Sequence, residues 1–113
     1  MAVTFGALLR EYRRSAGMTQ RQLAVRVGVD FTYVSKLENG RLPAPSASTT
    51  SALCRAMGVP PDRLMALAGK LPSDVEQEIA VSPSAQEFFR EALRIRPDDE
   101  QWARLTERLR TME

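Results

Sequence analysis

The chain has 113 residues, of which 43% are hydrophobic and 27% charged, and its formal net charge is +2. This length and balance predict one compact core, or one small core with a helical extension, and exclude a disordered chain. The sequence has no histidine and one cysteine, Cys54, which excludes an internal disulfide and histidine-dependent nucleophilic catalysis. We therefore expect no enzymatic activity, no metal site and no cofactor.

The charges are sorted along the chain. From Met1 to Gly69, nine Lys and Arg residues stand against four Asp and Glu residues, whereas from Lys70 onward seven basic residues stand against ten acidic ones. A basic first part suits a surface that binds phosphate groups, and an acidic second part would be repelled by DNA. We therefore expect the second part to lie away from any nucleic acid that the first part binds.

Helix caps and stops punctuate the sequence, and no useful strand alternation occurs, so we predict an all-α fold. The first helix runs from about Thr4 to Ala16, with Thr4 as its cap and Gly17 as its stop. Its apolar stripe consists of Phe5, Leu8, Leu9 and Tyr12. Its basic residues Arg10, Arg13 and Arg14 are expected to face mostly outward.

Two short helices follow. The second begins after Thr19, which can form a capping box with Gln22, and it ends at Gly28. The third begins at Asp30, whose carboxylate is expected to accept hydrogen bonds from the first-turn amides, and it ends at Asn39. The inward side chains are Leu23, Ala24, Val27, Val34 and Leu37, and those left outside are Phe31, Thr32, Ser35 and Lys36.

The next two helices complete a small domain. The stretch 41–45 is a proline-rich loop, after which Ser46 or Ser48 caps a fourth helix that ends at Gly58. A fifth helix opens at Pro60-Pro61 and closes at Gly69. We therefore predict a five-helix domain over residues 1–69.

A helical tail over residues 70–113 is predicted next. One helix covers about 72–80, a second starts at Ser82-Pro83, and a third starts at about Asp98. Trp102, Leu105, Leu109 and Met112 are spaced three, four and three residues apart, which gives a narrow stripe suited to another helix. Either this stripe pairs with the same stripe of a second copy of the chain, or it packs against its own chain. We favour dimerisation, through Phe88, Phe89, Trp102, Leu105, Leu109 and Met112.

The connection between the second and third helices is the most informative feature. Only Gly28 and Val29 join them, which predicts the tight corner of a helix-turn-helix motif. Ala24 is small where the two helices cross, and Gly28 permits a left-handed backbone. A helical hairpin with no nucleic-acid role is the alternative.

The run from Phe5 to Gly69 resembles the Cro/CI-type (XRE-like) helix-turn-helix regulators, most clearly in the segment LLREYRRSAGMTQRQLAVRVGVDFTYVSKLENGR. The resemblance implies a lambda-repressor-like fold and binding to double-stranded DNA. The segment ALAGKLP looks like the end of such a domain in bacterial regulators with a short helical tail. Phe31 departs from the pattern because that position is often polar in the family, and so does the proline-rich loop.

The resemblance also implies residue roles. Arg13 and Glu38 match a pair that joins the first helix to the end of the recognition helix. The implied phosphate contacts are Arg13, Gln20, Asn39 and Arg41, and the implied base-facing residues are Asp30, Phe31, Thr32, Ser35 and Lys36. Arg21 is added to the phosphate set as a basic residue beside Gln20. Lys36 can donate hydrogen bonds to guanine, and the Thr32 hydroxyl can either donate or accept one. Phe31 can contact a thymine methyl group. Asp30 suits a helix cap better than a cytosine contact.

These features together favour a dimeric transcriptional repressor that binds a short inverted repeat. The alternative is a protein-interaction role, antitoxin-like or peptidase-controlled, in which the tail binds a partner protein. No stretch reaches the length of a membrane span, and no signal-peptide pattern opens the sequence. We therefore expect a cytoplasmic bacterial protein that contacts no membrane and lies on the nucleoid when bound.

Overall fold

The computed structural model describes residues 3–113, and this part of the chain forms helices and no strands. The predicted all-α fold is therefore confirmed. The helices are α1 (Phe5–Ser15), α2 (Gln20–Val27), α3 (Phe31–Glu38), α4 (Ala47–Met57), α5 (Asp62–Ala68), α6 (Ser73–Ala80), α7 (Pro83–Ile95) and α8 (Asp99–Arg110). None of the helices described is long and apolar enough to cross a membrane.

The chain divides into two compact units, one up to Glu76 and one from Gln77 onward. The division falls inside α6, so the first unit includes α1 to α5 and the first turn of α6. The second unit holds the rest of α6 together with α7 and α8.

Side-chain caps fix where most of the helices begin. The hydroxyls of Thr4, Ser46 and Ser82 each accept a hydrogen bond from the backbone N–H three residues later. Thr19 and Asp98 form full capping boxes with the glutamine three residues on. The caps at Thr4, Thr19 and Ser46 were predicted from the sequence, and those at Ser82 and Asp98 lie where helices were predicted to start. The prediction for Asp30 was wrong, because its carboxylate accepts no capping hydrogen bond and stays exposed.

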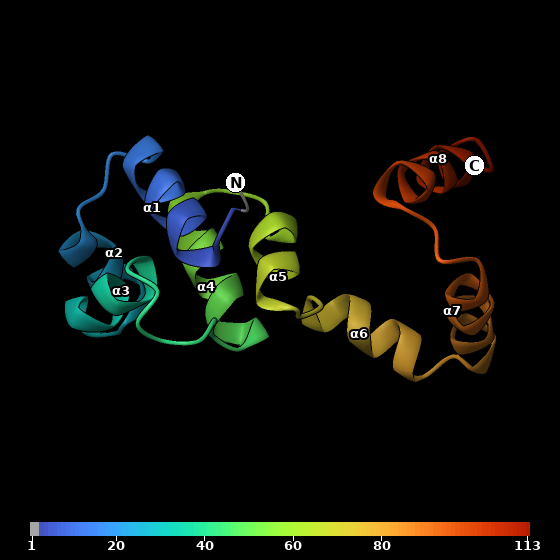
Figure 1. Cartoon of the computed structure of the whole chain (residues 1–113), viewed down its shortest axis with the longest axis horizontal. Coiled ribbons are helices and arrows are strands. Elements are labelled where there is room, and N and C mark those ends of the chain that lie inside the picture. The colour runs from blue at the N-terminus through green and yellow to red at the C-terminus, as the bar shows by residue number, and fades with distance from the viewer. Residues whose placement is uncertain (1–2) are drawn as a thin grey trace. The chain divides into compact units, whose positions relative to one another are not determined.

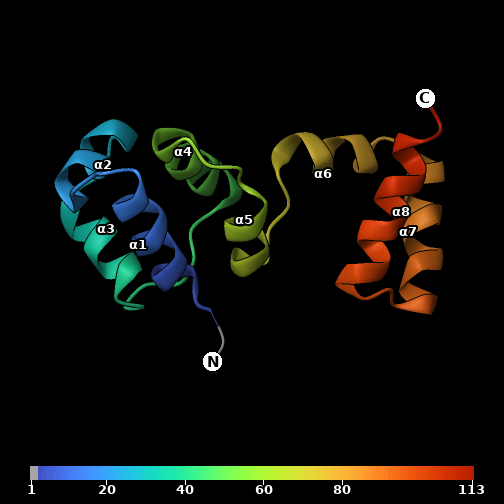
Figure 2. The ribbon, with the colours of Figure 1, turned by 90° about the horizontal axis from the view of Figure 1, so that it is seen from above.

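The first unit has one apolar core, shared by the five helices that Figures 1 and 2 show together. Leu8 and Leu9 of α1 and Leu23 of α2 are fully buried. The remaining core side chains, from all five helices, are Phe5, Ala24, Val34, Leu37, Leu53, Cys54, Met57 and Leu64. Tyr12 and Val27, which were also predicted to point inward, are only partly buried against this cluster. The core holds α2 and α3 at a fixed angle.

The second unit buries little of its apolar surface. From Gln77 onward, Ala92 is the only buried residue. The Phe89 ring of α7 lies 6.1 Å from the Trp102 ring of α8, centroid to centroid, and 5.2 Å from Phe88. The large apolar side chains exposed here are Val81, Phe88, Phe89, Leu93, Ile95, Leu105, Leu109 and Met112. The predicted stripe of α8 is therefore mostly exposed to solvent within this unit.

Candidate nucleic-acid interface

The corner between α2 and α3 has the geometry that the sequence predicts. Gly28 has φ +83°, a left-handed conformation that favours glycine. The N–H groups of Gly28 and Val29 both donate to the carbonyl of Ala24, at 2.8 Å and 3.0 Å. Ala24 itself is buried, as a small residue at the crossing of two helices must be. The corner is thus closed by hydrogen bonds as well as by packing.

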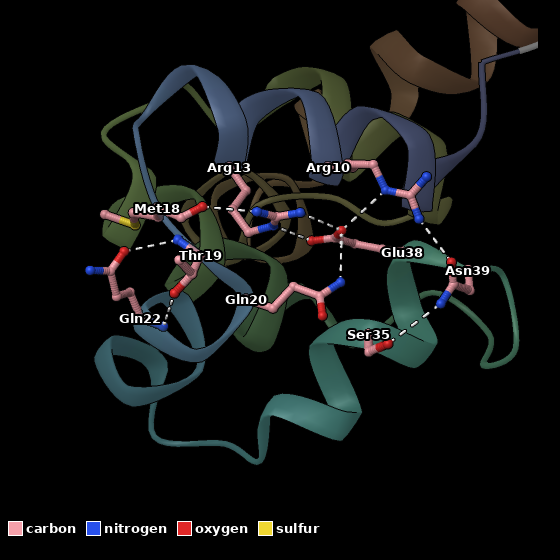
Figure 3. A network of polar contacts seen from close by, with 9 residues as sticks. All are labelled: Arg10, Arg13, Met18, Thr19, Gln20, Gln22, Ser35, Glu38 and Asn39. Carbon is pink, nitrogen blue, oxygen red and sulfur yellow. Dashed lines mark hydrogen bonds and ion pairs between the residues drawn. The ribbon is translucent and has the colours of Figure 1, made fainter.

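At the other end of α3 from this corner, three side chains converge on the carboxylate of Glu38, the last residue of that helix (Figure 3). Arg13 donates from Nε to Oε2 at 2.6 Å and from Nη2 to Oε1 at 2.9 Å. Gln20 Nε2 and Arg10 Nε donate to Oε1 at 3.1 Å and 3.3 Å. The Glu38 side chain is 0% exposed. The predicted ion pair between Arg13 and Glu38 is confirmed, and it belongs to a network that ties α1, α2 and α3 together.

The environment of Glu38 stabilises its charged form. Burial by itself would raise the pKa of Glu38, but the hydrogen bonds from Arg13 and Gln20, the charge of Arg13 and the hydrogen bond from Arg10 outweigh burial and lower that pKa. The hydrogen bond to Glu38 likewise raises the pKa of Arg13. Both groups are therefore charged at neutral pH, and each compensates the burial of the other.

The expectation that Arg13 faces mostly outward was wrong. Its side chain is only 10% exposed, and its Nη1 donates to the carbonyl of Met18 at 2.8 Å. The reason is the position of α3, whose last turn brings the Glu38 carboxylate to this face of α1. A phosphate contact by Arg13 stays a prediction, with little of the guanidinium exposed to make it.

Two residues of α1 were missed by the sequence reasoning. Arg10 bonds to Glu38 and also donates to Oδ1 of Asn39 at 2.8 Å. Gly6 lies against the end of α3, where an added Cβ would sit 2.6 Å from the Glu38 carbonyl oxygen. Gly6, Arg10 and Arg13 are spaced four and three residues apart, which places them on one helix face. That spacing was the signal in the sequence from which a shared face of α1 could have been predicted.

The remaining predicted contact residues surround the corner. Thr32 and Lys36 are exposed on α3 and Ser35 is half-buried, while Arg41 is exposed after the helix. Asn39 accepts from Arg10 and donates to the Ser35 hydroxyl at 3.4 Å. Gln20 stands at the first position of α2 with its amide nitrogen on Glu38. These residues come from α2, from α3 and from the segment that follows α3. Their contacts with DNA stay a prediction.

Phe31 does not lie free on this surface, as the sequence analysis expected. The ring is half-buried and packs against the apolar core. The guanidinium carbon of Arg21, from α2, lies 4.1 Å from the ring centroid, a distance at which a cation is attracted to an aromatic face. Phe31 and Arg21 also line a hollow of about 450 Å³ with Arg13, Met18, Thr19 and Gln20. The two side chains therefore form one stacked unit.

Comparison with known proteins assigns the fold to a family. The family model described as a helix-turn-helix domain matches residues 4–67, which contain α1 to α4 and most of α5. The chain belongs to the helix-turn-helix domain family. This match confirms the resemblance seen in the sequence.

Relatives of this helix-turn-helix chain are named as transcriptional regulators. It is 35% identical over 92 residues to the uncharacterized HTH-type transcriptional regulator RghRB of Bacillus subtilis, covering 79% of this chain and 66% of that protein. It is 36% identical over 66 residues to the HTH-type transcriptional repressor RghR of Bacillus subtilis, covering 58% and 49%. This chain therefore spans less than two thirds of the length of either relative.

A solved structure supports the same assignment. The crystal structure of the clp gene regulator ClgR from C. glutamicum matches with a TM-score of 0.51 and 34% sequence identity, over 57% of this chain and 83% of that one. The likeness covers roughly the share of this chain that the family model matches.

Proposed function

We propose that this protein is a sequence-specific regulator of transcription that inserts α3 into the major groove of double-stranded DNA. The observation that carries the proposal is the α2–α3 corner, in which a rigid turn presents the exposed side chains of Thr32 and Lys36 from α3. In helix-turn-helix proteins the second helix of such a corner reads base edges while the first crosses the backbone. Asp30, Phe31 and Ser35 complete the proposed base-facing set.

The proposed phosphate contacts frame α3 on two sides. Gln20 and Arg21 lie at the amino end of α2, where free backbone N–H groups favour an anion. Asn39 and Arg41 follow the end of α3. Because phosphate contacts fix orientation and base contacts give specificity, the first set would place α3 and the second would read the sequence.

Dimerisation through the second unit is part of the proposal. A helical unit of this size with one buried residue does not by itself cover its apolar side chains, and segments below about 40 residues generally need oligomerisation or another constraint to fold stably. Phe88, Phe89, Trp102, Leu105, Leu109 and Met112 form the proposed interface. A second copy of the same surface can cover it with twofold symmetry.

The charges of α8 favour such self-pairing. Asp98 caps the helix and Asp99 and Glu100 stand in its first turn, whereas Arg108 and Arg110 stand in its last turn, beside Glu107. Two α8 helices packed antiparallel along the stripe would place the acidic end of one beside the basic end of the other. A dimer would present two α3 helices to half-sites about 34 Å apart.

Repression is the proposed outcome of binding. The relative RghR is named a repressor, and a protein that occupies promoter DNA can block polymerase without a further domain. A role in binding an unrelated protein through the tail is the second candidate, because the same exposed apolar side chains would serve it.

The test is selection of bound sequences from a random duplex pool, followed by titration of the selected duplex at two salt concentrations. We expect an enriched inverted repeat whose affinity falls steeply with salt. Enrichment of a single half-site would retain DNA reading and contradict the dimer. No enrichment at either salt concentration would refute the proposed function and favour the protein-binding candidate.

A further inference from the structure

The stacked pair of Arg21 and Phe31 has a chemistry that the other proposed base contacts lack. Phe31 is the first residue of α3, and the amino-terminal residues of a recognition helix are those that approach base edges. Its side chain can neither donate nor accept a hydrogen bond. One part of the ring packs against the apolar core and the Arg21 guanidinium covers a face of it, so the remaining exposed part of the ring is a fixed apolar surface.

The major groove offers one apolar group to such a surface. Base edges there carry hydrogen-bond donors and acceptors, except for the methyl group on C5 of thymine. The same methyl group occurs at the same position in 5-methylcytosine. We propose that Phe31 reads the C5-methyl group of a pyrimidine and that Arg21 positions the ring for this contact. The inference rests on the DNA-binding role proposed above and names the chemical group that this part of the site recognises.

Arg21 is suited to positioning because its guanidinium is planar. Its central carbon lies 4.1 Å from the centroid of the Phe31 ring, so the guanidinium covers one face of that ring. Its N–H groups lie in its own plane and can donate sideways. The hollow beside the pair, with Gln20 and Thr19 in its wall, leaves room for a phosphate oxygen at that edge. Arg21 would thereby couple a backbone contact to the orientation of Phe31.

The experiment uses the full chain and the duplex obtained by selection. Each thymine of a half-site is replaced in turn by deoxyuridine, which removes the methyl group alone. At one position per half-site we expect affinity to fall about fourfold, the factor that corresponds to one buried methyl-sized group. A duplex with cytosine at that position should bind more weakly than the duplex with thymine. A duplex with 5-methylcytosine there should bind about fourfold more tightly than the duplex with cytosine, because the methyl group is restored.

The two methyl sources are separated by the same titrations. A thymine enriched by selection, with a loss on deoxyuridine, identifies thymine as the natural ligand. A gain on 5-methylcytosine that exceeds the difference between thymine and deoxyuridine identifies methylated DNA instead. Either result supports methyl reading.

Three variants assign the effect to this pair. Phe31→Gln should bring the affinity ratio of thymine to deoxyuridine close to one, whereas Phe31→Leu, which stays apolar, should keep most of it. Arg21→Lys keeps the positive charge but loses the planar stack, so the ratio should fall while the salt dependence is retained. Circular dichroism and thermal unfolding confirm that each variant is folded. A purely structural role for Arg21 would change the melting temperature and leave the ratio intact.

Failure of this inference differs from failure of the proposed function. If the wild type binds a selected repeat but no position distinguishes thymine from deoxyuridine, methyl reading is refuted and the DNA-binding role stands. A methyl effect that persists unchanged in Phe31→Gln refutes the assignment to Phe31. If no sequence is enriched, the proposed function fails and the inference fails with it.

Discussion

Glu38 is a buried carboxylate whose charge depends on partners from two other helices. Its pKa is below the ordinary value of 4.5, because the hydrogen bonds from Arg13, Gln20 and Arg10 outweigh the penalty of burial. A carboxyl whose folded-state pKa is lowered contributes stability above its unfolded-state pKa, and that stability is lost as pH falls through the folded-state value. The network should therefore weaken in acid.

The prediction is that the free energy of unfolding of the wild type decreases as pH falls below about 4.5. Glu38→Gln removes the titrating group, so the variant should be less stable at neutral pH and lose less on acidification. Urea unfolding of both proteins at several pH values measures the difference. Parallel pH profiles would contradict a stabilising charge at Glu38.

Lys36 and Arg41 should differ in what their removal does to DNA binding. Lys36→Ala should relax preference at one base position, at a cost of about 1–3 kcal/mol on the preferred base, while Arg41→Ala should weaken all duplexes about equally and reduce the salt slope by about 1. Arg41 is the better phosphate variant than Gln20, whose amide also bonds to Glu38. Repeating the selection with each variant checks the roles. The assignment fails if both variants relax the same base position.

The residues that sequence reasoning misplaced depend on distant neighbours. Helical periodicity identifies the side chains of α1, yet Arg13 is buried only because a carboxylate arrives from α3, 25 residues later. Phe31 is half-buried because it packs against the apolar core and Arg21 reaches over its ring from another helix. Asp30 begins α3 without capping it. The Arg13–Glu38 pair itself was predicted, but from the family resemblance and not from the local pattern.

At the scale of elements, local signals were sufficient. Thr4, Thr19 and Ser82 mark helix starts by hydrogen bonds to N–H groups three residues away, so each cap depends only on adjacent sequence. The Gly28 corner is equally local. How α1 packs on α3 is not local, because it depends on the absence of a side chain at Gly6.

Gly6→Ala tests the approach of α1 to α3. In an exposed helix this change would stabilise by about 1 kcal/mol, but here the new Cβ would lie 2.6 Å from the carbonyl oxygen of Glu38. We expect the free energy of unfolding to fall by about 1–3 kcal/mol, which is the usual cost of overpacking. Ala7→Gly, at the exposed neighbouring position, is the control and should cost about 1 kcal/mol from helix propensity alone. A stabilised Gly6→Ala variant would contradict the close contact.

At the scale of the whole molecule, the two units differ in the surfaces that they expose. The first unit has a packed core and a basic excess, whereas the second exposes apolar side chains and carries an acidic excess. Dimerisation through the second unit would raise the DNA affinity of the first, because two recognition helices held in one dimer bind an inverted repeat far more tightly than either does alone. Loss of dimerisation should therefore lower the affinity for the inverted repeat without changing the base preference.

Leu105→Asp is the substitution that separates these properties. It introduces a charge into the proposed interface of α8, so the full chain should become monomeric in sedimentation velocity while its helix content is retained. Affinity for the inverted repeat should fall at least tenfold, which corresponds to about 1.4 kcal/mol, and affinity for an isolated half-site should stay constant. Ala103→Asp adds the same charge at an exposed position outside the stripe and should preserve the dimer. If Leu105→Asp remains dimeric, the interface lies elsewhere. If its affinity for an isolated half-site falls as much as its affinity for the inverted repeat, then Leu105 supports DNA binding by each subunit and not dimerisation.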